Sequence, residues 1–274
     1  MDTTFSDFAH LSPSKCSVAY MTAEAVAFLQ QHEPEEGYFL GFSGGKDSIV
    51  TYELCRTAHV KFQAVYSCTG IDAPEVVRFI RQHYPDIDFC YPKITFWQGI
   101  RKKSPPLRRM RWCCETLKKD PVKKHPLFHN RILGLRAEES FKRAKRSRLE
   151  IKGKRKIRKI FKPIFHWLEW HVWDFIEERG LAYPSLYDEG FERIGCVVCP
   201  YIMHSNQAKV ERNKARWPQF YRVFEKVVAD WHKQGKQRNL TIFGDETPEQ
   251  YLTAYYHGFE QQASARAERK GDTE

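Results

Sequence analysis

The sequence predicts an α/β fold: a mostly parallel twisted sheet with helices on both faces, extended by a helical C-terminal segment. Short apolar runs of strand length alternate with segments of helical apolar spacing between residues 23 and 135. Parallel strands need crossover connections, which place helices on the faces of a sheet. The 274 residues are 42% hydrophobic, which is enough for a buried core and excludes a disordered or fibrous chain.

The predicted elements follow in order along the chain. A helix over residues 23–32 ends at the turn-forming EPEEG, and a strand over 38–42 runs into the loop SGGKDS. Helical spacing resumes over residues 49–59, a second strand covers 61–67, and a helix over 76–84 follows the turn TGIDAPE. Further short strands are expected at 88–91 and 131–135, and an aromatic helix is expected to end at Gly180. On this helix, Trp167, Trp170 and Trp173 are spaced by three, which favours a packing surface.

The pattern predicts three regions. Residues 1–36 form an N-terminal helical segment, residues 37–204 a core domain with a basic insertion at 140–162, and residues 205–274 a helical extension that ends in a frayed tail. No stretch resembles a membrane span: the longest uncharged run, Ile194 to Ala208, is interrupted by Pro200 and is shorter than the ~20 residues required. The N-terminus has neither a basic start nor an apolar run, so we expect a cytoplasmic protein with no membrane partner.

Positive charge is concentrated in the middle of the chain. Arg101 to Lys162 contains 24 Lys and Arg against 5 Asp and Glu, whereas the remainder contains 21 against 29. Clustered cations attract phosphates, so the asymmetry favours a polyanionic partner, with nucleic acid contacting residues 142–162. The alternative is a solvated surface loop.

The loop Ser43-Gly44-Gly45-Lys46-Asp47-Ser48 has the composition of a phosphate cradle. Glycines allow close backbone approach, and the free N–H groups at the start of the following helix face the anion. It is not a Walker A loop, because Leu40 stands where that motif needs its first glycine and Asp47 follows the lysine in place of Ser or Thr. Kinase or GTPase chemistry is therefore disfavoured.

Four of the eight cysteines are grouped in pairs: Cys113 with Cys114, and Cys196 with Cys199. In a reducing compartment these pairs indicate ligand or catalytic roles before disulfides. Adjacent thiolates diverge, which the four corners of an iron–sulfur cube accommodate more readily than one tetrahedral zinc ion. The other four cysteines are isolated and are read as small buried hydrophobes.

Several segments carry a family resemblance: SGGKDS, Thr69-Gly70-Ile71-Asp72-Ala73-Pro74-Glu75, and Gly134-Leu135-Arg136-Ala137-Glu138-Glu139-Ser140. Together with Val172-Trp173 and Leu186-Tyr187-Asp188, they resemble the PAPS reductase-like branch of the PP-loop nucleotide α-hydrolase (adenine nucleotide α-hydrolase) superfamily. The resemblance implies a PP-loop/HUP-like fold. It also implies an adenine-nucleotide site, with Lys46 and Asp47 as catalytic candidates, formed by Ser43, Gly44, Gly45, Lys46, Asp47, Ser48, Thr69, Gly70, Gly134 and Arg136.

The paired cysteines extend this resemblance. They are similar in placement to those of adenylyl sulfate reductases and DNA phosphorothioation sulfurtransferases, which implies a 4Fe-4S cluster on Cys113, Cys114, Cys196 and Cys199. Zinc is the alternative metal.

The sequence departs from the family pattern at three places. No cysteine follows Cys199, whereas the thioredoxin-dependent reductases carry a nucleophilic cysteine near the C-terminus. Leu168 replaces the usual helix-capping Ser or Thr, and His171 replaces the Asp that commonly precedes Val-Trp. The first departure argues against a standard reductase cycle, and the other two put the entry of that helix in question.

Three functions follow as hypotheses. The first is an enzyme that splits ATP at the α-phosphate into AMP and pyrophosphate for sulfur transfer onto nucleic acid, with magnesium as a further ligand and a protein as sulfur donor. The second is reduction of PAPS or adenylyl sulfate to sulfite. The third is a non-catalytic regulatory protein that binds nucleic acid.

Overall fold

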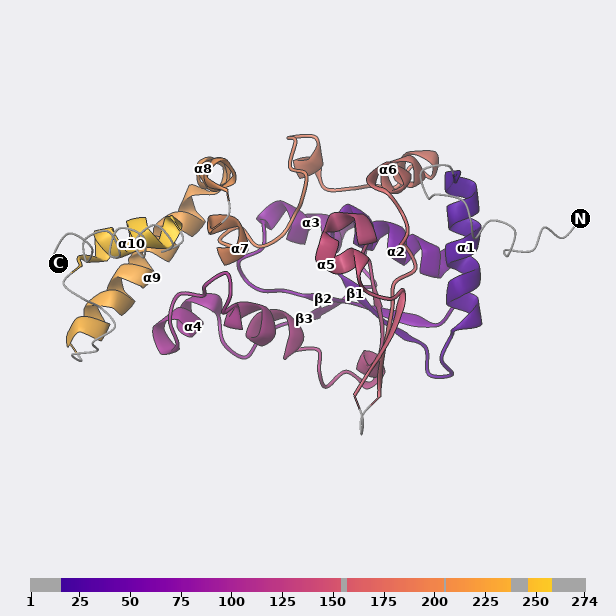
Figure 1. Cartoon of the computed structure of the whole chain (residues 1–274), viewed down its shortest axis with the longest axis horizontal. Coiled ribbons are helices and arrows are strands. Elements are labelled where there is room, and N and C mark those ends of the chain that lie inside the picture. The colour runs from indigo at the N-terminus through magenta and orange to yellow at the C-terminus, as the bar shows by residue number, and fades with distance from the viewer. Residues whose placement is uncertain (1–15, 154–156, 205, 238–245, 258–274) are drawn as a thin grey trace, which may run out of the picture. The chain divides into compact units, whose positions relative to one another are not determined.

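The computed structural model describes residues 16–153, 157–204, 206–237 and 246–257. The chain divides into two compact units (Figure 1). The first contains residues up to 67, 74–90 and 121–194, and the second contains residues 68–73, 91–120 and those from 195 onward. The frayed tail expected at the C-terminus lies outside the described residues. No helix in the described part of the chain is long and apolar enough to cross a membrane.

The first unit is built on a six-stranded sheet in the order β3-β2-β1-β4-β6-β5. All neighbouring strands are parallel except β5, which runs antiparallel to β6. This confirms the predicted fold class. The strands are β1 (Tyr38–Phe42), β2 (Phe62–Ser67), β3 (Asp88–Cys90), β4 (Asn130–Leu133), β5 (Leu149–Lys152) and β6 (Arg158–Phe161).

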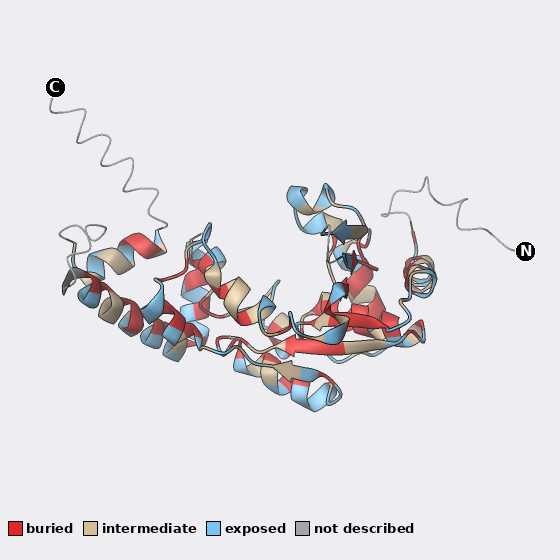
Figure 2. Ribbon diagram, turned by 90° about the horizontal axis from the view of Figure 1, so that it is seen from below, coloured by how far each residue is buried: buried red, intermediate tan, exposed pale blue. Residues whose placement is uncertain are grey.

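The central strand β1 is buried on both faces, as its apolar sequence predicts (Figure 2). Phe39 packs with Val122 and Phe128 on one side of the sheet. Its neighbour Tyr38 faces the opposite side, where its hydroxyl donates to the carbonyl of Leu29 at 2.8 Å. On that side lie three helices that pack on one another: α1 (Val18–Gln31), α2 (Lys46–Thr57) and α6 (Glu169–Glu178).

Helix α1 begins five residues before the predicted start. The hydroxyl of Ser17 accepts a hydrogen bond from the backbone N–H of Tyr20 and so caps the first turn. The remaining helical elements of this unit are α3 (Pro74–His83), η4 (Pro126–His129), η5 (Ala137–Glu139), α5 (Phe141–Ala144) and η6 (Ser185–Tyr187).

The predicted basic insertion at 140–162 is in part a component of the sheet. It supplies the hairpin β5–β6, and β6 pairs with β4. Ile160, Phe161 and Lys162 are buried, so the alternative of a solvated surface loop is wrong for this end of the segment. The sequence pattern does not predict these two strands, because they contain many cations and few apolar residues.

The second unit is helical. Its elements are α4 (Phe96–Lys102), a π-helical turn η3 (Cys114–Lys119), α7 (Pro200–Met203), α8 (Gln207–Arg216), α9 (Pro218–Gln237) and α10 (Pro248–Tyr256). Helix α9 packs on α4, α8 and α10. Pro218 begins α9, as its role as a helix breaker predicts.

Candidate functional site

The loop between β1 and α2 folds as a compact turn at the carboxyl end of the sheet. The hydroxyl of Ser48 donates to the carbonyl of Gly45 at 2.7 Å and lies 3.1 Å from the hydroxyl of Ser43. Gly44 has φ +73°, and a Cβ there would lie 2.8 Å from Cγ1 of Val76. The turn therefore requires glycine at position 44.

Gly134 brings the next loop against the start of α2. It follows β4, which pairs with β1, so both loops leave the sheet at the same edge. A Cβ on Gly134 would lie 2.7 Å from the carbonyl oxygen of Asp47 and 2.9 Å from the hydroxyl oxygen of Thr51. The two loops can meet this closely only because residue 134 has no side chain.

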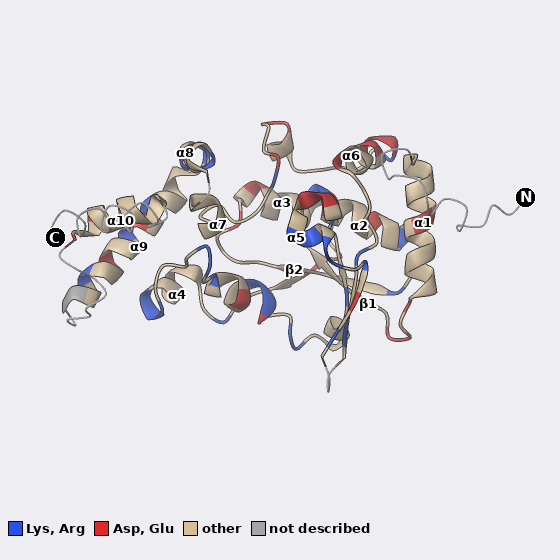
Figure 3. Ribbon diagram, viewed as in Figure 1, with Lys and Arg blue, Asp and Glu red and all other residues tan. Residues whose placement is uncertain are grey.

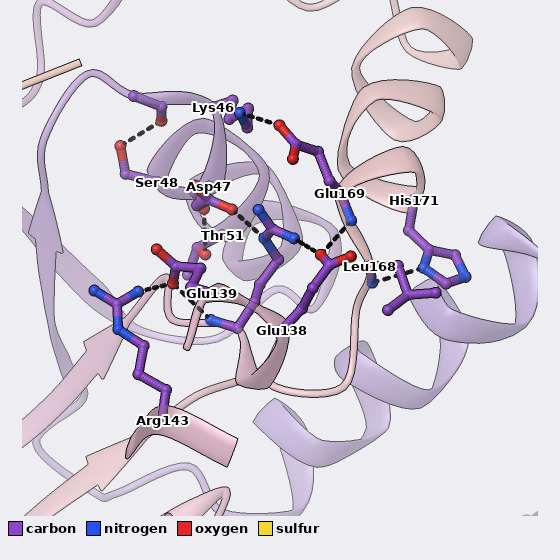
Figure 4. A network of polar contacts seen from close by, with 12 residues as sticks. Lys46, Asp47, Ser48, Thr51, Glu138, Glu139, Arg143, Leu168, Glu169 and His171 are labelled. Atoms are coloured by element: carbon purple, nitrogen blue, oxygen red, sulfur yellow. Dashed lines mark hydrogen bonds and ion pairs between the residues drawn. The ribbon is translucent and has the colours of Figure 1, made fainter. Parts of the chain in front are cut away.

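Lys46 is buried, and its ammonium is held on several sides. It donates to Oε1 of Glu169 at 2.6 Å and to the carbonyl of Glu192 at 2.9 Å (Figure 4). It also lies 5.3 Å from the ring centroid of Trp173 and 5.2 Å from that of Tyr187. The hydrogen bond from Lys46 holds the pKa of the Glu169 carboxyl below its usual value.

The backbone of Lys46 is also engaged. Its N–H, at the first turn of α2, donates to the hydroxyl oxygen of Tyr187 at 2.9 Å. Burial raises the pKa of Tyr187, which therefore stays a neutral phenol. A neutral hydroxyl thus caps an N–H group that is suited to an anion.

Arg136 is buried among carboxylates from both loops. Its Nε donates to Oδ1 of Asp47 at 2.7 Å, and its guanidinium pairs with Glu138 (Figure 4). Its backbone N–H donates to Oε2 of Glu139 at 3.1 Å, and Glu139 pairs in turn with Arg143. Both glutamates therefore contact Arg136, Glu138 through the guanidinium and Glu139 through the backbone N–H. The loops of Lys46 and Arg136 therefore form one polar network within the first unit.

Thr69 and Gly70, the third predicted loop, belong to the second unit together with all four paired cysteines. The N–H of Val197 donates to the carbonyl of Ile71 at 2.8 Å, and Asp72 forms an isolated bridge with Cys196. The hydroxyl of Thr69 lies 3.8 Å from the sulfur of Cys196. The TGID turn therefore supports the second cysteine pair.

The four thiols interact electrostatically. A hydrogen bond between the adjacent pair raises the pKa of Cys113 and lowers that of Cys114, and burial adds to the rise at Cys113. Cys196 and Cys199 act on Cys113 as well. Lys118, on η3, lies close enough to Cys196 for that thiol to be the main cause of its raised pKa. A cation beside the thiols favours their thiolate forms.

Whether these residues fit a metal depends on the metal. Four thiols beside a cation have the donor chemistry of an iron–sulfur cluster. Within the described ranges, no group of three or more His, Cys, Asp and Glu side chains is arranged to hold a metal ion.

Several residues of the polar network around Lys46 and Arg136, here called the phosphate-loop network after the predicted role of Ser43–Ser48, were not predicted. Trp173 and Tyr187 lie in segments of the family resemblance but had no assigned role, and Trp173 was read as part of a packing stripe. The stripe is not uniform: Trp167 is buried, Trp170 is exposed and Trp173 faces Lys46. Glu169 is one of many acids in the sequence, and nothing in its spacing pointed to Lys46.

Comparison with known proteins gives matches that cover most of the chain. The model of the phosphoadenosine phosphosulfate reductase domain matches residues 37–202. An uncharacterized protein of Methanocaldococcus jannaschii is 32% identical over 203 residues, which are 70% of this chain and 41% of that protein. A second protein of that organism is 28% identical, and the matched part is 46% of its length. The chain thus spans less than half the length of these two relatives.

Named reductases are also similar. The adenosine 5′-phosphosulfate reductase of Staphylococcus haemolyticus is 25% identical over 65% of this chain and 75% of that enzyme. The crystal structure of phosphoadenylyl-sulfate reductase from Candida auris superimposes with a TM-score of 0.50 at 17% identity, covering 72% of this chain and 97% of that one. At that identity the likeness concerns the fold. The match of the domain model over residues 37–202 shows that the chain belongs to the phosphoadenosine phosphosulfate reductase domain family and has its adenine nucleotide α-hydrolase-like fold.

Proposed function

We propose that this protein is an enzyme that binds ATP or a related adenine nucleotide at Ser43–Ser48 and acts at the α-phosphate to serve sulfur transfer. The observation that carries the proposal is the position of Lys46. A buried ammonium and the first N–H groups of α2 lie together at the carboxyl end of a parallel sheet, where such folds bind nucleotides.

Each residue of the network has a role in this proposal. Lys46 exchanges the carboxylate of Glu169 for a phosphate oxygen and stabilises the negative charge that develops there. Arg136 holds Asp47 through the 2.7 Å hydrogen bond, which fixes the first turn of α2. Asp47 is also the candidate ligand for magnesium. Arg136 acts as a positioning residue, since Asp47 and Glu138 already occupy its guanidinium.

The four thiols would hold a 4Fe-4S cluster, with Cys114 from the start of η3, Cys113 directly before it, and Cys196 and Cys199 from the segment before α7. When bound, the cluster supplies electron transfer or a local electrostatic field. Burial raises the pKa of Cys196, and Lys118 opposes this rise; Lys118 also contributes to the lowered pKa of Cys114, so it favours the thiolate ligands.

Reduction of a sulfonucleotide to sulfite is the second candidate, favoured by the names of the reductases to which the chain is similar. That reaction needs a nucleophilic thiol outside the four ligands. Burial raises the pKa of Cys55 and of Cys90, and Cys16 is buried, which are poor settings for a nucleophile. Sulfur transfer is therefore our first choice, and a reductase would depend on Cys68 or on a partner's thiol.

Product analysis of the anaerobically purified protein tests the proposal. With ATP, a sulfide donor and RNA or DNA, we expect AMP and pyrophosphate to form, and Lys46→Ala to lower the rate by about 10²–10³-fold while iron and sulfide contents are unchanged. Lys46→Arg is the matched variant that keeps the charge. Sulfite formation from adenylyl sulfate in place of AMP and pyrophosphate would favour the reductase. If no substrate is turned over, both enzymatic hypotheses are wrong, and the non-catalytic regulatory protein remains.

A further inference from the structure

The cations of this chain are not equally available to a polyanion. The sequence places most positive charge between residues 101 and 162, and segment 142–162 was the expected site of nucleic-acid contact. In the structure many cations of that segment are paired with acids inside the first unit. Ion pairs join Arg143 to Glu139, Arg146, Lys152 and Lys162 to Glu150, and Arg148 to Glu24.

The segment 101–112 of the second unit differs. It contains six Lys and Arg and no acid (Figure 3). Arg108 and Arg111 are exposed, and neither forms an ion pair with a carboxylate among the residues that the structure describes. Their guanidiniums lie instead over the exposed ring of Tyr201, at 4.9 Å and 5.4 Å from its centroid. We call Arg108, Arg111 and Tyr201 the arginine–tyrosine face.

This face is held in place from both ends of its loop. The carbonyl of buried Pro106 accepts a hydrogen bond from the hydroxyl of Tyr255 at 2.6 Å. At the other end, Trp112 donates from Nε1 to the carbonyl of Ser104 at 3.0 Å and packs so tightly on Gly99 that a Cβ there would lie 2.1 Å from the indole. The backbone that carries the two arginines is therefore fixed before a partner binds, which reduces the ordering that binding requires.

We propose that the arginine–tyrosine face binds single-stranded nucleic acid. Guanidiniums without carboxylate partners bind phosphates bidentately, and binding releases the counterions of the strand. Exposed tyrosine rings and guanidinium planes stack on unpaired bases, which a duplex does not offer. This chemistry selects a single strand over a duplex and over an acidic protein surface, which would use the charges but not the stacking.

The face adjoins the four thiols in sequence and in the same unit. Arg111 lies two residues before Cys113, and Tyr201 lies two residues after Cys199. A strand bound here would pass beside the proposed cluster. Binding itself does not depend on the proposed sulfur transfer; only the role of the strand as sulfur acceptor rests on the proposed function.

Fluorescence anisotropy with a labelled RNA of about 15 nucleotides, and with DNA of the same sequence, tests this face in the full chain. The variant R108Q/R111Q should weaken binding at least tenfold near 100 mM salt, and should reduce the slope of log K against log salt by about 1.4, since each phosphate contact contributes about 0.7. Tyr201→Ala should weaken binding about 5- to 100-fold, and Tyr201→Phe should bind like the unmodified protein.

The matched control removes the same charge from the hairpin of the first unit. In R158Q/K159Q two exposed cations of β6 are lost, and binding should stay within about twofold, because the proposed contacts lie on segment 101–112. The proposal is overturned if R158Q/K159Q weakens binding as much as R108Q/R111Q does, if Tyr201→Ala has no effect, or if a duplex competes as well as the single strand. Circular dichroism and iron content confirm that each variant is folded.

Failure of this proposal is distinguishable from failure of the proposed function. Lys46→Ala should lower the rate of AMP release by about 10²–10³-fold, as above, and leave RNA binding unchanged. Conversely, R108Q/R111Q should leave the affinity for ATP unchanged and lower the affinity for RNA.

Discussion

At the scale of single residues, the positive charge of Lys46 in the loop Ser43–Ser48 is compensated by a carboxylate of the same chain. The ammonium of Lys46, 5% exposed, pairs with the carboxylate of Glu169, which is half exposed on α6. A nucleotide phosphate that contacts Lys46 must displace this carboxylate. The hydroxyl of Tyr187 occupies the adjoining N–H in the same way. In the proposed function, the affinity of this loop for a phosphate therefore depends on competition with Glu169 and Tyr187.

Glu169→Gln should strengthen nucleotide binding. The substitution removes the charge that competes for Lys46, and because the carboxylate is half exposed, the expected gain in ATP affinity is about two- to fivefold. Isothermal titration of ATP measures it. Glu178→Gln removes an exposed carboxylate from the end of the same helix and should leave the affinity unchanged. Weaker binding by Glu169→Gln would mean that Glu169 positions Lys46 and does not compete with the phosphate.

A second residue-scale feature is the entry of α6, which the sequence put in question. Leu168 stands at the cap and has no hydroxyl to offer, but His171 supplies the missing contact. Its Nδ1 accepts the backbone N–H of Leu168 at 2.8 Å, and its Nε2 lies 3.2 Å from the carbonyl of Cys16. Only the neutral ring with its proton on Nε2 satisfies both partners. Burial accordingly lowers the pKa of His171 below 6.5.

This histidine should make folding stability depend on pH. Because the folded-state pKa lies below the value of 6.5 in the unfolded chain, the unfolded state binds the proton first. The contribution of His171 is thus fully present above about pH 6.5 and is lost as the pH falls below it. His171→Gln keeps an acceptor for the N–H of Leu168 and does not titrate, so its urea midpoint should fall less between about pH 7.5 and 5.5. The exposed His83→Gln serves as control; equal pH slopes for all three proteins would exclude His171 as the source.

At the scale of elements, the hairpin β5–β6 depends on a buried ion pair. Lys162 is fully buried after β6 and pairs with Glu150 of β5, which is 12% exposed. Glu150 also pairs with Arg146 and Lys152, and the hydrogen bond from Arg146 is the main cause of its lowered pKa. One carboxylate thus compensates three cations at the edge of the sheet.

Removing the carboxylate of Glu150 should lower the free energy of unfolding more than removing the ammonium of Lys162. Glu150→Ala leaves the Lys162 ammonium buried without its counter-charge, and we expect a loss of about 3–5 kcal/mol in the free energy of unfolding. Lys162→Met fills a similar volume with an uncharged side chain and should cost distinctly less. Urea unfolding of both variants decides the order. If Lys162→Met is the less stable of the two, the buried ammonium of Lys162 stabilises the fold, which would contradict this prediction.

At the scale of the whole molecule, the two candidate constellations belong to different compact units. The contacts of Lys46 and Arg136 described above are made by residues of the first unit, and the four paired cysteines belong to the second. Metal and nucleotide can therefore be removed separately. The domain boundaries at residues 37 and 205 remain predictions. They divide the chain into consecutive regions, whereas the second compact unit takes its residues from three separate stretches of the chain.

Cys196→Ser should remove the metal and spare nucleotide binding. We expect the iron content of the anaerobically purified variant to fall by at least about half, since one thiolate ligand is lost. The affinity for ATP should stay within about twofold, because no residue of the phosphate-loop network is changed. Cys90→Ser, outside the four, should leave iron unchanged. If the unmodified protein contains zinc and no iron, the four thiols hold zinc, and the cluster hypothesis is wrong.

The sequence by itself determined the fold class, the positions of four strands and the glycine-containing turn between the first strand and the next helix. These are local patterns: apolar alternation, glycines at a strand end and a helix start, each of which depends on near neighbours in the chain. Spacing also identified two cysteine pairs, and the family resemblance predicted that they form one site. Only the tertiary structure decided the rest. Glu169 and Tyr187 hold Lys46, His171 accepts the N–H of Leu168 and contacts the carbonyl of Cys16, and Lys162 pairs with Glu150. These contacts join residues that the sequence pattern does not connect. Charge can be counted from a sequence, but its partners are set by folding.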